Sequence, residues 1–185
     1  MESRIKVRRK PLYIWVAVLI VTLILYCAKR DLFDISFLRE NISDHKVPVL
    51  ILYLIILTFI GLTVIPSTPI AVAGVLLFPP MTAYIINLIG IITSSLVVYY
   101  FTKYLRLDAW LDAKYPAKIE KIRKALRNKE LPIIAGWSFF PFVPTDLIIY
   151  VSSTLHIPFW KCVFGVIIGE GTLNALYIFS IDFLF

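Results

Sequence analysis

The sequence predicts an all-α multi-pass membrane protein, organised as an inverted repeat of two re-entrant helical hairpins plus transmembrane helices. Three observations support this prediction. Hydrophobic residues make up 59% of the 185 residues, against about 45–50% apolar residues in a soluble domain. Prolines interrupt the apolar stretches at two related places. The positive charge, a formal net charge of +7, is concentrated in two clusters that flank long apolar runs.

Several apolar segments follow one another, but some are too short or too interrupted to cross a bilayer. A spanning helix needs about 20 residues. The segment 70–78 is shorter than this, and Pro141 and Pro144 interrupt the segment 131–157. We therefore expect these parts of the chain to enter the membrane and turn back. The apolar segments are 12–28, 47–65, 70–78, 81–105, 131–157 and 159–185.

The two basic clusters predict the orientation. One opens the chain and the other lies between Lys103 and Lys129, and cytoplasmic loops of membrane proteins carry an excess of Lys and Arg. Both clusters can be cytoplasmic only if 47–80 is a re-entrant hairpin, so that 81–105 crosses back to the cytoplasm. If 47–65 crossed completely, the second cluster would lie outside. We expect a multi-pass protein of the cytoplasmic membrane with a cytoplasmic N-terminus, with an internal eukaryotic membrane as the alternative.

These assignments divide the chain into three regions. The first apolar segment resembles a signal peptide, but no convincing small-residue cleavage site follows it, so we interpret it as a retained span. The predicted regions are 1–30, the basic cytoplasmic N-terminus and first transmembrane helix; 31–46, an extracytoplasmic linker; and 47–185, a membrane domain with hairpin 47–80, helix 81–105, cytoplasmic amphipathic helix 106–130, hairpin 131–157 and helix 159–185.

A weak internal repeat connects the two hairpins. Pro66 and Pro69 frame one P-x-x-P motif, and Pro141 and Pro144 frame another. After each motif come an apolar stretch, a further proline and a long apolar segment. Because the two units would enter from opposite faces, they form an inverted repeat, which in transporters places a site where broken helices meet. The alternative is that these prolines only break membrane helices.

The segment 106–130 has the pattern of a basic amphipathic helix. Apolar residues recur there at three- and four-residue spacing opposite Lys and Arg side chains, and Pro116 is expected to break the helix. We expect it to lie on the cytoplasmic surface and to contact anionic lipid headgroups, with a regulatory or partner-binding role as the alternative. This placement explains the basic pI without nucleic-acid binding, and a homodimer is compatible with the sequence.

Glu170 is the most informative single residue, because it lies near the middle of the last apolar segment. A carboxylate at that depth must be protonated, paired or in contact with water. Gly165, Gly169 and Gly171 surround it and allow another backbone to approach. A functional role, in proton exchange or headgroup contact, is our first interpretation, and a structural hydrogen bond is the alternative.

The hairpin turns carry the other polar candidates. Asp146 follows the second P-x-x-P motif, where a carboxylate can cap the returning helix; a direct place in the permeation path is the alternative. Ser67, Thr68 and Thr145 offer hydroxyl groups to backbone groups freed at the turns.

Signals for an enzyme, a metal site or a cofactor are poor, and we expect none of the three. The chain has no G-x-x-x-x-G-K-[ST], H-E-x-x-H or G-x-S-x-G motif. Ser152 and Ser153 precede His156 closely, but no third group is placed to orient the imidazole. Cys27 and Cys162 have no metal-ligand spacing.

The proline motifs and the apolar pieces after them, in this order and spacing, resemble the DedA superfamily, also called the SNARE-associated Golgi or VTT-domain family. The resemblance covers about residues 47–171 and makes 47–185 a VTT-like membrane domain. It implies two inverted re-entrant hairpins and a role in lipid movement between leaflets or membrane homeostasis, including scrambling and proton-linked flipping. The residues that carry it are Pro66 to Pro69, Ala73 and Gly74 through Phe78, Ser138 to Asp146, and Gly165 to Gly169.

The resemblance also implies which residues line a transport path, and it shows where this chain differs. Around the hairpins these are Pro66, Ser67, Thr68, Pro69, Gly74, Ser138, Pro141, Pro144, Thr145 and Asp146. Many relatives carry an arginine where this chain has Ser138, and some carry another where it has Pro144. Pro79 and Pro80 stand where a glycine is usual. No membrane-buried arginine is left in the predicted hairpins.

The resulting functional hypothesis is a membrane transporter that moves lipids between leaflets, as a scramblase or flippase, and contributes to membrane homeostasis. Headgroups would pass between the hairpin tips beside Asp146 and Glu170. The alternatives are a proton-linked transporter of small ions or solutes and a non-transporting membrane organiser.

Overall fold

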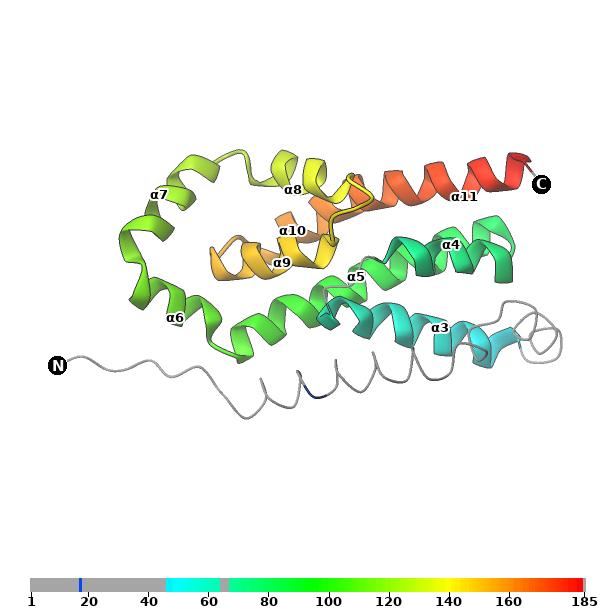
Figure 1. Ribbon diagram of the computed structural model, residues 1–185, viewed down its shortest axis with the longest axis horizontal. Helices are drawn as coiled ribbons and strands as arrows, with labels where there is room; N and C mark the ends of the chain where they lie inside the picture. The colour runs from blue at the N-terminus through cyan, green and yellow to red at the C-terminus, as the bar shows by residue number, and fades with distance from the viewer. Residues whose placement is uncertain (1–16, 18–45, 64–66, 185) are drawn as a thin grey trace.

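The computed structural model describes residue 17 and residues 46–63 and 67–184, which belong to a bundle of helices (Figure 1). None of the described residues lies in a β-strand, which confirms the all-α class. The predicted first span 12–28 and linker 31–46 lie outside the described residues except for Ala17 and Lys46. The described elements after residue 45 are α3 (Lys46–Ile60), η2 (Gly61–Thr63), α4 (Thr68–Leu77), α5 (Pro80–Tyr104), α6 (Leu107–Lys114), α7 (Pro116–Leu126), α8 (Glu130–Ser138), α9 (Thr145–Thr154), α10 (Phe159–Val166), η3 (Ile167–Gly171) and α11 (Thr172–Leu184).

Two long apolar helices run through the bundle. One is α5, and the other is continuous through α10, the π-helical turn η3 and α11. The stretches Pro80–Tyr104 and Phe159–Ser180 are long and apolar enough to cross a membrane. Each helix starts at or directly after a proline, Pro80 or Pro158, where the missing N–H costs no intrahelical hydrogen bond.

The first helical hairpin consists of α3, the 3₁₀ turn η2 and α4. In Figure 1, α3 runs from the right of the view toward the middle, and α4 returns to the right. α3 packs along α5, and α4 packs against both α5 and α11. This hairpin therefore rests on both long helices.

The second helical hairpin consists of α8, a turn over residues 139–144, and α9. It opens toward the left of Figure 1, and its turn lies near the middle of the molecule, as the turn of the first hairpin does. α8 packs against α10 and η3, while α9 packs against α5. The two hairpins thus approach the middle from opposite ends.

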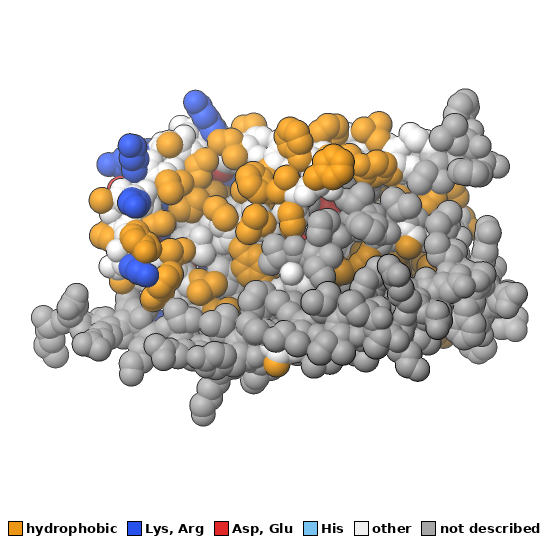
Figure 2. Space-filling model, viewed as in Figure 1, with side chains coloured by type: hydrophobic (Ala, Val, Ile, Leu, Met, Phe, Trp, Pro, Cys, Tyr) orange, Lys and Arg blue, Asp and Glu red, His pale blue; other side chains and the backbone are white. Residues whose placement is uncertain are grey.

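Two short helices, α6 and α7, cover the left end of the bundle in Figure 1. Arg106, with φ 60°, separates α5 from α6, and α7 begins at Pro116, so the predicted break at this proline is present. Figure 2 shows Lys and Arg side chains gathered at this end of the visible face, while hydrophobic side chains cover much of the remainder that is not grey.

The core has two parts, one beneath each hairpin. Tyr53 and Leu57 of α3 pack with Ile178 of α11 and with residues of α4 and α5. Ile134 of α8 and Ile149 of α9 pack with residues of α5 and α10. Large apolar side chains elsewhere are exposed on the outside of α3, α5, α10 and α11, which suits a lipid environment.

Candidate functional site

Both hairpin turns and both long helices meet around a small cavity. Its volume is about 20 Å³, enough for about one water molecule. Its walls are unusually polar for the middle of an apolar bundle, because more than half of the residues that line it carry hydroxyl, amide or carboxyl groups. We call this space the central cavity. The polar residues of its wall are Ser67, Asn87, Ser94, Ser95, Thr145, Asp146, Glu170 and Asn174.

Glu170 enters the cavity from the π-helical turn η3. A π turn adds a residue to the helix and often marks a functional site, and Gly169 and Gly171 on either side lower the local preference for a regular α-helix. The Glu170 side chain is buried, and its Oε1 accepts a hydrogen bond of 2.6 Å from the Ser67 hydroxyl. Ser67 is the N-cap residue of α4, but its hydroxyl makes no capping bond.

Asp146 enters the cavity from the first turn of α9. The N-cap residue of this helix is Pro144, which makes no side-chain capping bond, and Asp146 lies in the first helical turn, where its carboxylate bonds to its own backbone N–H. The carboxylate is buried, and its Oδ1 also accepts a hydrogen bond of 2.9 Å from the Ser94 hydroxyl of α5. Gly61 makes this possible, because any side chain there would collide with Ser94 and Asp146.

The two carboxylates connect the hairpins to the long helices in a crossed pattern. Ser67 of the first hairpin donates to Glu170 on the last long helix. Asp146 of the second hairpin accepts from Ser94 on α5, the long helix that follows the first hairpin. Each hairpin tip is therefore held by the long helix that follows the other hairpin.

The hydrogen-bond partners of both carboxylates are neutral groups: serine and threonine hydroxyls and, for Asp146, its own backbone N–H. In residues 46–63 and 67–184, no ion pair joins Asp146 or Glu170 to a Lys, Arg or His side chain, and no basic residue lines the cavity. An uncompensated buried carboxylate is costly. The site can therefore neutralise itself by taking up a proton or by holding a cation.

Asn87, which lines the cavity, contacts the buried hydroxyl group of Tyr53. Tyr53 donates from its hydroxyl toward the backbone oxygen of Ile70, 2.9 Å away, and lies 2.8 Å from the Oδ1 position of Asn87. The Nδ2 position of Asn87 is buried without a partner. Nothing in the sequence around Asn87 indicates this unpartnered end.

The other predicted path residues have different surroundings. Pro66 lies outside the described residues, and Thr68 and Pro69 begin α4. Gly74 faces Tyr53, whose ring leaves no room for a Cβ atom. Pro141 lies in the turn between α8 and α9. Gly74 and Pro141 do not line the central cavity.

Ser138 ends α8 and is buried with its hydroxyl unpaired. It lies beside Gly169, where an added Cβ would meet Ser138 and the backbone oxygen of Ala135. Gly165 is similarly close to Ile134, whereas Gly171 has only Leu88 at 3.1 Å from an added Cβ. Gly165 and Gly169 therefore set the close packing of the last long helix against α8, next to Glu170.

Two parts of this site were not predicted from the sequence. Ser94 and Ser95 are adjacent hydroxyl residues in an apolar helix, a signal that could have been noticed. Gly61 carried no such signal, because its role comes from the approach of Ser94 and Asp146 from distant parts of the chain.

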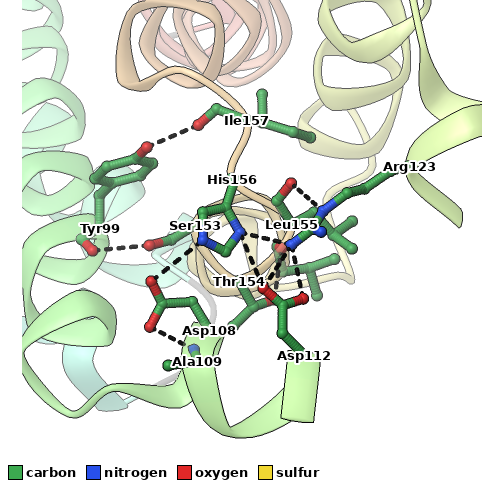
Figure 3. Close-up of polar contacts among 11 residues, drawn as sticks. Tyr99, Asp108, Ala109, Asp112, Arg123, Ser153, Thr154, Leu155, His156 and Ile157 are labelled. Carbon is green, nitrogen blue, oxygen red and sulfur yellow. Dashed lines mark hydrogen bonds and ion pairs between the residues drawn. The ribbon is translucent and has the colours of Figure 1, made fainter. Parts of the chain in front are cut away.

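A separate cluster of charged side chains lies at the end of the bundle (Figure 3). Arg123 Nη2 donates to both carboxylate oxygens of Asp112, at 2.8 and 3.0 Å, and its Nε donates to the Leu155 oxygen at 3.1 Å. His156 Nδ1 lies 2.7 Å from Arg123 Nη2, and its Nε2 lies 3.6 Å from Asp108. We call Asp108, Asp112, Arg123 and His156 the end cluster.

The contacts of His156 in the end cluster show whether it pairs with Ser152 or Ser153. Ser153 donates to the backbone oxygen of Tyr99 at 2.9 Å, and the Ser152 hydroxyl is buried without a partner. His156 contacts Arg123 and the two aspartates and makes no hydrogen bond with either serine. These three residues therefore do not form a nucleophile with its base. The described residues also contain no group of three or more His, Cys, Asp or Glu that could hold a metal ion.

Comparisons with known proteins identify the family. The model of the VTT domain, the domain of the DedA and SNARE-associated Golgi proteins, matches residues 65–183. This match includes α4 through α11 and every described polar residue of the central cavity. No curated protein and no solved structure matches the chain significantly. The chain therefore belongs to the VTT-domain family of membrane proteins.

Proposed function

We propose that this protein moves lipids between the two leaflets of a membrane, as a scramblase or flippase, and so contributes to membrane homeostasis. The proposal includes a topology in which α3–α4 and α8–α9 are re-entrant hairpins related as an inverted repeat. The observation that carries it is the meeting of both hairpin turns, from opposite ends of the bundle, around buried carboxylates and hydroxyls (Figure 1). Transporters built from inverted repeats place their sites where such broken helices meet.

A lipid needs two surroundings at once, a polar route for its headgroup and an apolar surface for its tails. Asp146 and Glu170 with their hydroxyl partners supply polar groups at the hairpin tips. The exposed apolar side chains of α5, such as Ile85, Ile89 and Leu96, supply a surface for lipid tails. A route open to the bilayer on one side suits this distribution better than a sealed pore.

The cavity of about 20 Å³ is far too small for a lipid headgroup. Movement of a headgroup therefore requires the hairpin tips to separate from the long helices. The bonds Ser67–Glu170 and Ser94–Asp146 are the contacts that would break first. We infer that these two bonds hold the route closed.

The proposal also includes an orientation and a location. The N-terminus and the segment 106–130 lie in the cytoplasm, and the membrane is the cell membrane. Lys118, Lys121 and Lys124 of α7 are exposed and contact anionic lipid headgroups there. The proposed mechanism requires no nucleic acid, no cofactor and no enzymatic step.

Transport of a small ion or solute is the second candidate. The size of the central cavity favours it, because the space fits one water molecule or one small ion without any opening of the hairpins. The two candidates differ in what must move, a hairpin tip for a lipid or only side chains for an ion.

The test is leaflet exchange in reconstituted liposomes. Fluorescent phospholipids are placed in both leaflets, and a membrane-impermeant quencher reports how fast the inner pool becomes accessible. Ser94→Ala and Ser67→Ala, which remove the closing hydrogen bonds, are expected to accelerate exchange. Ser180→Ala, an exposed serine on α11, is the matched control.

The outcomes separate the candidates. Lipid exchange by the wild type that accelerates in Ser67→Ala and Ser94→Ala, but not in the control, supports lipid transport. Ion flux without lipid exchange supports the second candidate. A protein that moves neither, at any pH gradient, but loses its cellular effect when 106–130 is deleted is a membrane organiser.

A further inference from the structure

We propose that the central cavity binds one Na⁺ ion between the two hairpin tips. This inference goes beyond lipid transport and does not depend on it, because binding of an ion can be measured without any transport. It also departs from the expectation that the chain has no metal site. Three features of the described residues support it: the charge of the cavity, the identity of its one unpartnered polar group, and its size.

The charge of the cavity favours a cation. Asp146 and Glu170 each accept a hydrogen bond from a serine hydroxyl. No basic side chain in the described ranges forms an ion pair with either carboxylate. Ser67 and Ser94 occupy their single protons in these bonds, so their oxygen lone pairs remain available to a cation. The wall therefore presents acceptors to any ligand inside.

Asn87 supplies an independent indication. Tyr53 has one hydroxyl proton but two acceptors within reach, the Ile70 oxygen at 2.9 Å and the Oδ1 position of Asn87 at 2.8 Å. If the proton is given to Ile70, Tyr53 must accept from Asn87, and the amide nitrogen of Asn87 then faces Tyr53. Both contacts are satisfied only in this orientation.

With the amide in this orientation, the unpartnered end of Asn87 is its carbonyl oxygen. Asn87 is 2% exposed and lines the central cavity. An unpartnered oxygen at such a place costs free energy, and a cation is the ligand that satisfies an acceptor. The oxygen atoms available to the ion are those of Asn87, Asp146, Glu170, Ser67, Ser94 and Thr145.

Size and charge select Na⁺ among the hard cations. Mg²⁺ keeps several of its water molecules when bound, and a space of about 20 Å³ does not hold them. The cost of transfer into a medium of low dielectric constant rises with the square of the charge, which disfavours Ca²⁺ in the middle of an apolar bundle. A dehydrated Na⁺ ion surrounded by oxygen atoms fits both conditions, and with one proton shared by the two carboxyl groups it leaves the cavity without net charge.

The experiment measures the thermal unfolding of the full-length protein in detergent, followed by tryptophan fluorescence. The melting temperature is compared in NaCl, KCl and choline chloride at equal ionic strength. A ligand that binds only the folded state raises the melting temperature, and we expect a rise of roughly 5 °C in NaCl relative to choline. Equilibrium binding of radioactive Na⁺ to the same preparation gives the stoichiometry, expected to be one.

Variants show whether the ion is in the central cavity. Asp146→Asn and Glu170→Gln keep the shape of each side chain and remove its charge, so both proteins are expected to fold in choline and to lose the Na⁺-dependent rise. Glu120→Gln removes an exposed acid of α7 and is expected to retain the full rise. Asn87→Leu, which removes the unpartnered oxygen, is expected to weaken Na⁺ binding at least tenfold.

Three results would overturn the proposal. The first is the same melting temperature in NaCl and choline chloride together with no bound radioactive Na⁺. The second is an Na⁺-dependent rise that survives in both Asp146→Asn and Glu170→Gln. The third is stabilisation by CaCl₂ or KCl that exceeds the effect of NaCl, which would assign the cavity to another ion.

Discussion

The central cavity and the end cluster both contain two acidic side chains, but they compensate the negative charge in opposite ways. In the end cluster, Arg123 binds Asp112 with two hydrogen bonds and lies beside His156 (Figure 3). In the central cavity, Asp146 and Glu170 are each held by a serine hydroxyl. Asp112 therefore has a permanent positive partner, whereas Asp146 and Glu170 have only neutral partners among the described residues.

This difference predicts different responses of the two regions to loss of a charge. A carboxylate bound to arginine keeps its charge and its position, so the end cluster fastens α6 and α7 to the turn between α9 and α10. A buried carboxylate with neutral partners can accept a proton, a cation or the positive part of a headgroup without losing an ion pair. Variants of the two regions should therefore respond differently to loss of charge.

The largest effect is expected from Gly61→Ala. The added Cβ would collide with the Ser94 hydroxyl and the Asp146 carboxylate, so the turn must shift and the bond between them is lost. Overpacking of this kind costs about 1–3 kcal/mol, which corresponds to roughly 2–10 °C in melting temperature.

Gly136→Ala is the matched control, because nothing lies within 4 Å of the Cβ that it adds. Alanine is also the better helix former, so this variant of α8 should melt at the wild-type temperature or slightly above it. A melting temperature of Gly61→Ala equal to that of Gly136→Ala would contradict the tight approach of Ser94 and Asp146.

The next effect is expected from Arg123→Leu. This change removes the bonds to Asp112 and to the Leu155 oxygen and leaves His156 between two aspartates. The Arg123 side chain is 30% exposed, so water weakens the loss, and we expect about 1–2 kcal/mol. Thermal unfolding measures it, with Lys124→Leu as control because Lys124 has only a 3.7 Å pair with Glu120.

The difference in charge compensation between the two regions is tested most directly by the same substitution, Asp to Asn, in each. Asp112→Asn should destabilise by about 1 kcal/mol, because Arg123 loses a charged partner. Asp146→Asn keeps an acceptor for Ser94 and removes a buried charge, so its melting temperature in Na⁺-free buffer should equal or exceed that of the wild type. Equal losses in the two variants would show that Asp146 is compensated as Asp112 is.

The sequence predicted features that depend on local patterns. Apolar length and prolines predicted the helical class, and the prolines also marked both hairpin turns. Glu170 was identified because a carboxylate in a long apolar segment conflicts with its surroundings. Such conflicts are visible without a partner being known.

Features that depend on two distant segments were not predictable. Asp146 was expected to cap its own helix, since the N-terminal position alone favours that role. Its additional partner Ser94 lies 52 positions earlier in the chain and could not be predicted from that position. The contacts of Arg123 with Asp112 and His156 were not predictable either, because nothing in a single sequence brings α6, α7 and the end of α9 together.

The variant Tyr99→Phe asks how much of the stability of this end of the bundle comes from neutral bonds. The Tyr99 hydroxyl donates to the Ile157 oxygen at 2.7 Å, next to the end cluster (Figure 3). Removing it leaves a buried acceptor without this donor and should cost about 1 kcal/mol. Tyr100→Phe, at an exposed neighbouring position, changes the same group and should be neutral. If Tyr99→Phe costs as much as Arg123→Leu, neutral backbone bonds hold this end of the bundle as firmly as its ion pair does.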